Sequence, residues 1–388
     1  MPKRYWNDKS ECRMTKTRKR SSYAESKDPE AGPWIRRRAP STLLKMTGAA
    51  LAPRTVSHSC FVIRHSSFVI RHSSFVIIFT NVIKIAAPDF DLEKTLHSGQ
   101  VFHWQNAGEG FVGTIGDRAV FLEQSGKLLR ASVASASRRL ISDAQDARAT
   151  IKHYFALDHP LAEICNSFPK DPVMNEARAF CGGLRIIRQP RWECLATFIC
   201  SSMKQVAHIR QISLALRRRF GEQEKIGHQL VYTFPSARQL AQSSEKELRH
   251  CKLGYRAKNL RATAQLVSSG QANLEAWSGL PDAELRERLC ALPGVGPKIA
   301  NCVMLFAYER LRAFPIDVWI ERVLRQHYFS PRKKMSARRL REFSETYFGE
   351  HGGYAQQYLF HHARVAQRQR NPKRRNIGAL QNASANGG

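Results

Sequence analysis

A lysine and an aspartate, each at the start of an expected helix, are the residues of this sequence best suited to covalent chemistry. Lys298 follows the glycine-rich stretch LPGVGP, and Asp317 comes 19 residues later within FPIDVWIERVL. A lysine at a crowded helix start can lose solvation, which favours the neutral, nucleophilic amine. A carboxylate fixed nearby can stabilise the positive charge that develops on a sugar ring. The pair therefore suits cleavage of a glycosidic bond.

The glycines before the lysine do not form a nucleotide-cofactor motif. A P-loop needs Gly-Lys-Ser/Thr, whereas here Pro297 precedes the lysine and Ile299 follows it. A dinucleotide-binding motif needs a preceding strand, but PDAELRERLCAL has leucines at helical spacing. We expect a hairpin between two helices, in which the amides of Gly294, Val295 and Gly296 attract an oxyanion. No cofactor and no metal are expected.

The composition indicates which oxyanion this is. The 388 residues include 62 Lys and Arg against 32 Asp and Glu, a net charge of +30 that is not confined to one end. A phosphate-rich partner, nucleic acid, follows from this excess. The sequence contains no long basic amphipathic helix lined with large apolar residues, so it does not indicate a membrane surface as the partner. The nine cysteines form no C-x-x-C pair, and we expect them to be reduced and mostly buried in an intracellular, DNA-associated protein.

The pattern along the chain predicts an α+β fold. Short aromatic and β-branched runs (VFHWQ, GFVGTIG, AVFLEQ, KLLRAS) between Gly and Asp residues predict an antiparallel sheet. From about Pro190 onward nearly every segment has helical spacing, and Ser244 with Glu247 forms an expected capping box. We therefore expect a β-rich N-terminal domain over 87–185 and an all-α domain over 186–368 that contains the hairpin.

The two ends of the chain carry other patterns. Residues 1–86 are expected to be a disordered leader, in which SSFVIRH repeats every seven residues as contiguous apolar runs unlike a coiled coil. An Arg-rich targeting segment is a second interpretation of its first 60 residues. Residues 369–388 are expected to be a disordered basic tail.

The hairpin, the lysine and the aspartate resemble the helix–hairpin–helix DNA glycosylases, which carry LPGVG-x-K and a downstream P-x-D. Further blocks are similar to the eukaryotic type of 8-oxoguanine DNA glycosylase/lyase. They are SGQVFHW at 98–104, RQPRWECLATFICSS at 188–202, KLGYRAKNL at 252–260 and GYAQQYLF at 353–360. The likeness covers roughly residues 90 to 368 in order. It implies a bifunctional enzyme of base excision repair that acts, as a monomer, on double-stranded DNA containing an oxidised purine.

The resemblance also implies roles for individual residues. Lys298 would attack the anomeric carbon and form a Schiff base, with strand cleavage by β-elimination, and Asp317 would support the ionised sugar. The base pocket would use the carbonyl of Gly99 to read the N7–H of 8-oxoguanine, with Cys302 and Phe360 on the two faces of the base. Gln356 would contact its Watson–Crick edge.

The DNA contacts implied by the family lie outside this pocket. Tyr255 would wedge into the base stack, Arg256 would face the orphaned cytosine, and the hairpin residues 294–296 would hold phosphate. The chain departs from the family at Met203, where the family has Asn, and at His208, where it has Arg. Both family residues engage the cytosine, so these departures affect recognition of the opposite base. Two further departures are Trp319 for His and Ala363 for Asp.

Each role has a structural alternative. Cys302 and Phe360 also suit a core, Gly99 a turn, and Tyr255 with Arg256 a solvated helix start. Two other functions compete: a monofunctional alkylated-base glycosylase, which uses water in place of the lysine, and a non-catalytic DNA-binding helix–hairpin–helix protein. The iron–sulfur branch needs four cysteines after the helical domain, and none follows residue 302.

Overall fold

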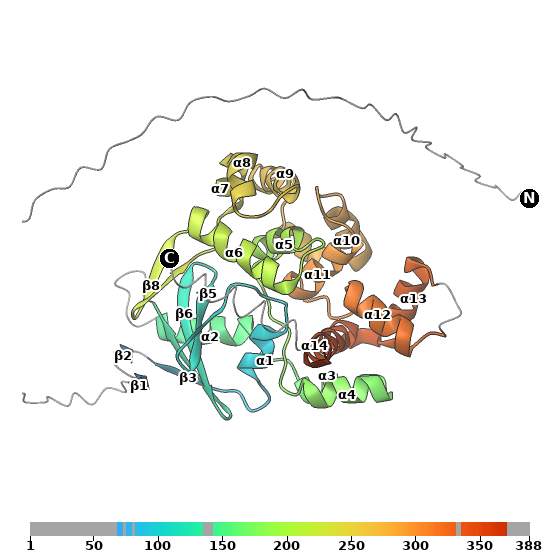
Figure 1. The fold of residues 1–388 in the computed structure, drawn as a ribbon, viewed down its shortest axis with the longest axis horizontal. Coiled ribbons are helices and arrows are strands. Elements are labelled where there is room, and N and C mark those ends of the chain that lie inside the picture. The colour runs from blue at the N-terminus through green and yellow to red at the C-terminus, as the bar shows by residue number, and fades with distance from the viewer. Residues whose placement is uncertain (1–67, 73–74, 80–81, 135–142, 331–334, 371–388) are drawn as a thin grey trace, which may run out of the picture. The chain divides into compact units, whose positions relative to one another are not determined.

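The computed structural model describes residues 68–72, 75–79, 82–134, 143–330 and 335–370, and Figure 1 shows their arrangement. Most of the expected leader and basic tail lie outside these residues. Within the described ranges no helix is long and apolar enough to cross a bilayer. The seven cysteines in these ranges are free, and six of them are buried, as the sequence predicts.

A five-stranded antiparallel sheet forms the N-terminal part, in the order β3-β7-β6-β5-β4. The strands are β3 (Ile83–Ala86), β4 (Gln105–Ala107), β5 (Gly110–Ile115), β6 (Arg118–Ser125) and β7 (Leu128–Val133). Two-residue turns join the last four strands, and each turn begins with a glycine: Gly108, Gly116 and Gly126, at φ 58°, 62° and 56°. Such turns need positive φ at this position, which glycine adopts without strain.

The sheet begins earlier than the sequence pattern predicted. Ile83–Ala86 pairs with β7, although these residues were expected to belong to the disordered leader. Their alternation of buried and exposed side chains is typical of a strand, but four residues beside an apolar repeat give a weak signal. The repeat itself also differs from the prediction, because β1 (Phe68–His72) and β2 (Phe75–Phe79) pair as an antiparallel hairpin.

Helices form the rest of the described chain. Their bounds are α1 (Leu92–His97), α2 (Asp143–Tyr154), α3 (Leu161–Asn166), α4 (Pro172–Phe180), α5 (Arg191–Cys200), α6 (Val206–Phe220), α7 (Ala237–Gln242), α8 (Glu245–His250), α9 (Arg256–Ser268), α10 (Asp282–Cys290), α11 (Pro297–Ala307), α12 (Val318–His327), α13 (Ala337–Tyr347) and α14 (Gly352–Arg370). Two 3₁₀ turns, Ala276–Gly279 and Gly349–His351, connect some of them. The expected capping box of Ser244 and Glu247 begins α8. The α+β prediction is therefore confirmed.

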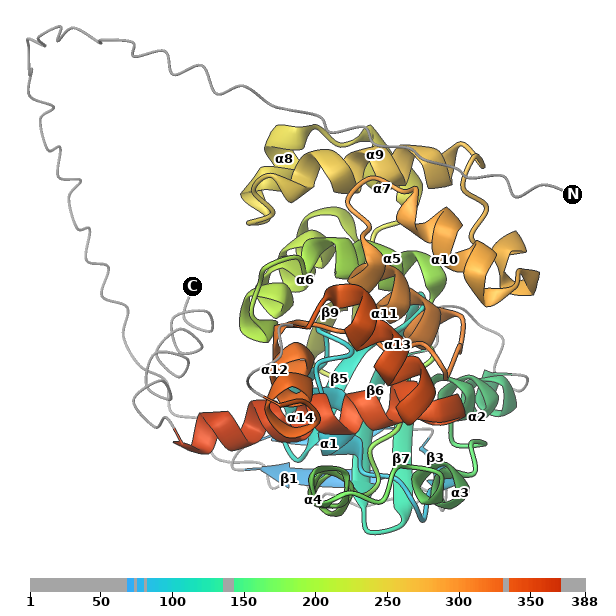
Figure 2. The same cartoon turned by 90° about the vertical axis from the view of Figure 1, so that its right-hand side faces the viewer.

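Two helices from the range predicted for the β-rich domain pack with the helical part of the protein. Helices α3 and α4 lie inside the range expected to be the β-rich domain, but they pack against α14, as Figures 1 and 2 show. Their apolar residues, such as Ile164 and Met174, belong to the core of the helical part. The Tyr358 hydroxyl of α14 donates to Leu184 O at 3.0 Å, just beyond these helices. An apolar stripe predicts that a helix is buried, but it does not identify the partner.

A hairpin that the sequence did not predict interrupts the helical part. Strands β8 (Gln223–Ile226) and β9 (Gln229–Tyr232) pair with each other and pack on the sheet. Their Ile226 and Val231 join Val112 and Phe121 in a small core on one face of the sheet. A larger core with α1 and α2 covers the other face, which explains why every residue of β5 is buried.

Candidate active site

The lysine hairpin has the predicted geometry: α10, a tight turn and α11. Gly294 has a φ of 81°, and a Cβ placed on it would lie 2.8 Å from the Cβ of Asn259, so the turn packs closely on α9. The Thr263 hydroxyl of α9 donates to the carbonyl of Pro293 at 2.9 Å. Gly296 is the N-cap of α11 with no side-chain cap, which leaves the helix N-terminus suited to an anion.

Lys298 lies in the first turn of α11, half-buried against α5. Its Nζ donates to the Oγ of Ser201 at 3.3 Å and lies 5.7 Å from the ring centroid of Phe198. That ring stacks on Phe306 at 5.5 Å with an interplanar angle of 8°, so an aromatic wall supports the lysine. The Ser201 hydroxyl donates to Phe198 O at 2.7 Å, which leaves a lone pair for the lysine.

Asp317 and Cys302 lie within the electrostatic reach of Lys298. Burial raises the pKa of Asp317, and the Ile320 N–H and the Lys298 charge oppose this shift. Burial also raises the pKa of Cys302 to about 11; the Lys298 charge opposes the rise and the Asp317 charge adds to it. The Lys298 charge therefore acts on both Asp317 and Cys302, although Asp317 lies at the start of α12 and the other two residues lie in α11.

The carboxylate of Asp317 is also fixed by its own helix. As N-cap of α12, its Oδ1 accepts hydrogen bonds from the N–H groups of Trp319 at 3.0 Å and Ile320 at 2.9 Å. An aspartate at this position favours the helix, as the sequence predicts. The capping role and a catalytic role are compatible, because the cap uses one oxygen and leaves the other.

The predicted base-pocket residues from the two ends of the chain meet. A Cβ placed on Gly99 would lie 3.0 Å from Cε1 of Phe360, and Gly99 has a φ of 89°. Gln356, one turn before Phe360, is 4% exposed. Its Oε1 is buried and has no hydrogen-bond partner in the described part of the chain. A buried, unpartnered amide oxygen is costly unless a ligand provides a donor.

A network of buried amides holds the loop that contains Gly99. The Gln100 side chain donates to Arg185 O at 2.8 Å and accepts from Ile187 N at 2.8 Å. Gln189 Nε2 donates to Gln100 O at 2.8 Å, and Gln357 Nε2 donates to Ser98 O at 3.1 Å. The loop is thereby attached both to the segment before α5 and to α14.

Tyr255 and Arg256 differ strongly in exposure. Tyr255 is 61% exposed at the N-terminus of α9, as a wedge requires, whereas Arg256 is 5% exposed. The Arg256 guanidinium donates to the carbonyls of Ser202 and Leu253. In this structure Arg256 therefore has a structural role within the protein, and its role toward the orphaned cytosine stays a prediction. The departures Met203 and His208 are both exposed.

Sequence reasoning missed two features near or between the domains. One is Ser201, the hydrogen-bond partner of Lys298; it lies in the matched block ICSS but has no distinctive pattern of its own. The other is a buried ion pair between Glu193 of α5 and Arg217 of α6. Arg217 Nη1 also donates to Thr114 Oγ1 on β5 at 2.8 Å, which links the helical part to the sheet.

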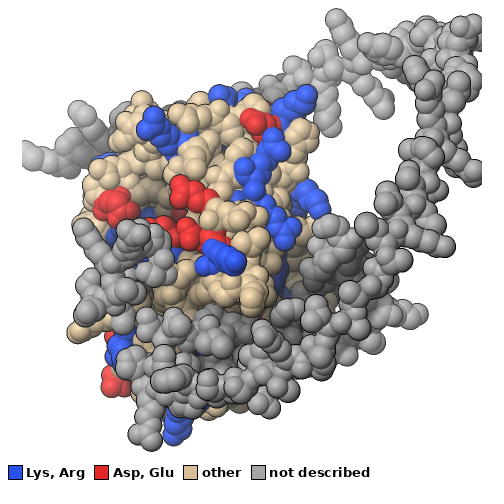
Figure 3. All heavy atoms as spheres, turned by 90° about the vertical axis from the view of Figure 1, so that its left-hand side faces the viewer, with Lys and Arg blue, Asp and Glu red and all other residues tan. Residues whose placement is uncertain are grey.

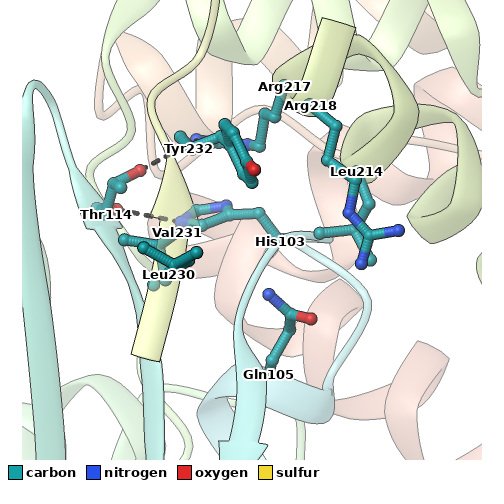
Figure 4. A pocket seen from close by; sticks show the side chains of 10 residues that line it. His103, Gln105, Thr114, Leu214, Arg217, Arg218, Leu230, Val231 and Tyr232 are labelled. Atoms are coloured by element: carbon teal, nitrogen blue, oxygen red, sulfur yellow. Dashed lines mark hydrogen bonds between the residues drawn. The ribbon is translucent and has the colours of Figure 1, made fainter. Parts of the chain in front are cut away.

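A cavity of about 230 Å³ lies beside this ion pair, between the sheet, α6 and β9. Figure 4 shows His103, Arg217 and Tyr232 around it. Burial and the Arg217 charge lower the pKa of His103 well below its usual value, so this histidine is neutral. The lining includes none of the predicted site residues, and the cavity is a junction between the two parts of the fold.

Acidic and basic side chains occur together on one face of the protein. The face in Figure 3 carries acidic side chains in its centre with basic ones around them. The net positive charge therefore does not make this face uniformly basic. Among the residues that the structure describes, no group of three His, Cys, Asp or Glu is placed to hold a metal ion.

Comparisons with known proteins agree with this geometry. A family model described as 8-oxoguanine DNA glycosylase, N-terminal domain, matches residues 82–195, and one described as HhH-GPD superfamily base excision DNA repair protein matches residues 196–346. The chain is 31% identical over 296 residues to N-glycosylase/DNA lyase OGG1 of Arabidopsis thaliana, covering 72% of this chain and 78% of that protein.

Solved structures are similar as well. The 8-oxoguanine glycosylase/lyase of Clostridium acetobutylicum, in complex with double-stranded DNA containing cytosine opposite 8-oxoguanine, is 28% identical with a TM-score of 0.67. The match covers 77% of this chain and 98% of that one. MBOgg1 in complex with a low-affinity DNA ligand is 32% identical with a TM-score of 0.66, covering 78% of this chain and 99% of the other.

Proposed function

The chain belongs to the 8-oxoguanine DNA glycosylase family within the HhH-GPD superfamily of base excision DNA repair proteins, and from this membership we propose that it excises 8-oxoguanine from duplex DNA and then cleaves the strand. Its partner is double-stranded DNA that contains the oxidised purine, on which it acts as a monomer. The observation that carries the mechanism is the placement of Lys298, which follows the hairpin and is hydrogen-bonded to Ser201, close enough to Asp317 at the start of α12 for its charge to act on that carboxyl.

The first step is displacement of the base. The neutral amine of Lys298 attacks C1′ of the sugar, and the N-glycosidic bond breaks with its electron pair going to the departing base. The lysine nitrogen loses one proton on bonding to C1′, which balances the proton that the base takes up. The Asp317 carboxylate, held by two backbone N–H groups, stabilises the positive charge that develops on the sugar. The Ser201 hydroxyl orients the amine, because it accepts a hydrogen bond from Nζ.

The second step uses the covalent adduct. Ring opening of the sugar gives a Schiff base to Lys298, whose positive nitrogen makes the C2′ protons acidic. Loss of one C2′ proton expels the 3′ phosphate by β-elimination, and hydrolysis of the Schiff base releases the lysine. This step separates a bifunctional enzyme from a glycosylase that uses water.

We propose that the base lies between Phe360 and Cys302, the two residues that the family likeness assigns to its faces. The oxygen of Gln356, buried and without a partner in the described part of the chain, is available to accept a hydrogen bond from the edge of the base. The carbonyl of Gly99 is suited to accept from the N7–H that distinguishes 8-oxoguanine from guanine. The raised pKa of Cys302 keeps its thiol neutral, which suits contact with the face of an uncharged ring.

Borohydride reduction tests the proposal, because it converts the Schiff base into a stable protein–DNA adduct. The parent protein should be trapped on a duplex containing 8-oxoguanine, and Lys298→Gln should abolish both trapping and strand cleavage while still binding the lesion. Lys225→Gln, which removes an exposed lysine on β8, is the matched control and should be trapped normally.

Three outcomes would contradict the proposal. Trapping that persists in Lys298→Gln would place the nucleophile elsewhere. Base release by the parent without any trappable adduct would favour the monofunctional, water-using glycosylase, and binding without base release would favour a DNA-binding protein without catalysis.

A further inference from the structure

One face of α14 contacts the segment that leads into Gly99. The i, i+3, i+4, i+7 spacing, which places side chains on one side of a helix, joins Gln357, Phe360, His361 and Arg364. All four side chains are buried. The base-pocket residue Phe360 lies within this face, and Arg364, which no sequence pattern singled out, lies one turn beyond it.

The Arg364 guanidinium is bonded to the end of α1, just before Gly99. Its Nη2 donates to the carbonyl of His97, the last residue of α1, and lies 3.3 Å from Nδ1 of His361. Burial and the Arg364 charge lower the pKa of His361 to about 4, so at neutral pH this imidazole is uncharged and can accept from the guanidinium. Donors that have such partners hold a buried, planar guanidinium in a defined position.

The same guanidinium lies against two residues of the predicted base pocket. Its Cζ is 5.5 Å from the ring centroid of Phe360, within the range of a cation–π interaction. A Cβ placed on Gly99 would lie 3.6 Å from Arg364 Nη1 as well as 3.0 Å from the Phe360 ring. One charged group is therefore adjacent both to the ring that would cover the base and to the glycine whose carbonyl would read its edge.

Resting on the proposed function, we propose that Arg364 is a positioning residue of the base pocket. Its fork holds the carbonyl of His97, two residues before Gly99, while its cation lies over the Phe360 ring. The stacking surface and the reading carbonyl are thereby kept at one separation, which 8-oxoguanine must match with both contacts at once. Loss of the guanidinium should therefore weaken recognition of the base and leave the attack of Lys298 on the sugar intact.

A purely structural role for Arg364 would have different consequences. A bond that only joined α1 to α14 would contribute to stability, and its loss would slow every reaction of the protein to the same extent. A positioning role affects only those reactions in which a base enters the pocket. The two roles are therefore separated by substrates with and without the base.

The first test uses Arg364→Met, which keeps a long side chain but removes the charge and the hydrogen bond to His97. Single-turnover excision from a duplex containing 8-oxoguanine should be slower by at least about tenfold, because misplacement of a bound group by about 1 Å can cost about 10²-fold in rate. On a duplex with a preformed abasic site, borohydride trapping through Lys298 should match that of the parent. Equal slowing on both substrates would show a structural role and overturn the proposal, as would an unchanged rate on the lesion.

Two further variants make this test specific. Arg364→Lys keeps the charge but lacks the planar fork, so it should also slow excision of the lesion. A lysine variant as fast as the parent would contradict the two-point contact. Arg310→Met is the matched control, because Arg310 Nη2 also donates to backbone carbonyls, those of Ser278 and Leu280, beyond the end of α11. It should excise the lesion at the rate of the parent under conditions where circular dichroism shows both variants folded.

A double-mutant cycle tests whether Arg364 acts through the ring. Phe360→Leu removes the aromatic face over which the cation lies. Arg364→Met should then slow excision clearly less in the Phe360→Leu background than in the parent, because residues in contact have effects that are not additive. The same slowing in both backgrounds would show that Arg364 does not position the ring.

Binding gives a readout that does not depend on catalysis. In the Lys298→Gln background, Arg364→Met should lower the affinity for the lesion duplex by at least about fivefold, since a cation–π contact at a desolvated site is worth that factor or more. Affinity for undamaged duplex should not change, because phosphate contacts provide it. A parallel loss on both duplexes would contradict a role in reading the base.

The failure of this inference can be distinguished from failure of the proposed function. A parent protein that is never trapped on the lesion duplex would overturn the proposed function itself. A parent that is trapped, together with an Arg364→Met variant that excises the lesion at the same rate, would overturn only the role of Arg364.

Discussion

Gly99 and Phe360 lie so close that a Cβ on the glycine would be 3.0 Å from ring atom Cε1 of Phe360. These residues are near opposite ends of the folded chain, one in the loop after α1 and one in α14. Since a real Cβ would press on the ring, the position favours glycine for two independent reasons: the contact and the φ of 89°.

Gly99→Ala should therefore reduce excision of 8-oxoguanine by at least about tenfold, because a shift of the Phe360 ring misplaces the base. Stability should also fall by about 1–3 kcal/mol from the forced backbone conformation. Gly270→Ala is the matched control: Gly270 has a φ of 80°, but a Cβ placed on it would meet nothing within 4 Å. It should lose stability without losing activity, as measured by urea unfolding and single-turnover kinetics. Equal activity loss in both variants would contradict the contact argument.

Asp317→Asn should slow excision by about 10²-fold while lesion binding persists, because the side chain keeps its shape but loses its charge. Asparagine is also a good N-cap, so the stability of α12 should change by less than about 1 kcal/mol. Asp91→Asn, at the N-cap of α1, is a control that changes a similar cap outside the site. Single-turnover rates and filter binding measure both effects. Excision that is unaffected in Asp317→Asn would remove this carboxylate from the mechanism.

The excision rate should depend on pH through Asp317. Burial raises the pKa of this carboxyl above its usual 3.8, so its negative charge is lost at a higher pH than for an exposed aspartate. Because the folded protein binds this proton more tightly than the unfolded chain does, protonation of Asp317 stabilises the fold. This stabilisation is fully present below the unfolded pKa and is lost as pH rises through the folded pKa. Activity needs the charged carboxylate, so the excision rate should rise with pH as Asp317 loses its proton. The midpoint of this acidic limb should lie above pH 3.8. A pH–rate profile of the parent should show this limb. An identical limb in Asp317→Asn would assign it to another group.

The buried pair of Arg217 and Glu193 should matter more for folding than for chemistry. Arg217→Met should destabilise the protein by about 3–5 kcal/mol, since it leaves a buried carboxylate without its partner. Arg219→Met is the control on the same helix: the ion pair of Arg219 with Glu247, at 3.4 Å, is exposed and should contribute less than about 1 kcal/mol. Urea unfolding monitored by circular dichroism measures both variants. Similar losses in the two would show that the buried pair has no special weight.

Local rules were enough for the sequence to determine the centre of the site. Two glycines before Pro297 make the hairpin that leads into α11. Asp317 is of a residue type that favours the N-cap position, and it begins α12. These features depend on backbone conformations of a few neighbouring residues, so a short stretch of sequence specifies them. The same holds for the turns of the sheet, each of which begins with a glycine at positive φ.

Only the tertiary structure decided which distant residues meet these local features. Ser201 contacts a lysine 97 positions away, and Gln357 contacts Ser98 across 259 positions. Likewise, the four-residue strand β3 is formed by pairing with β7, and the four-residue strand β8 packs on β6 of the distant sheet. Their own alternation is too short to predict a strand. Packing against a particular neighbour is a property of both surfaces together, so neither segment contains the information alone.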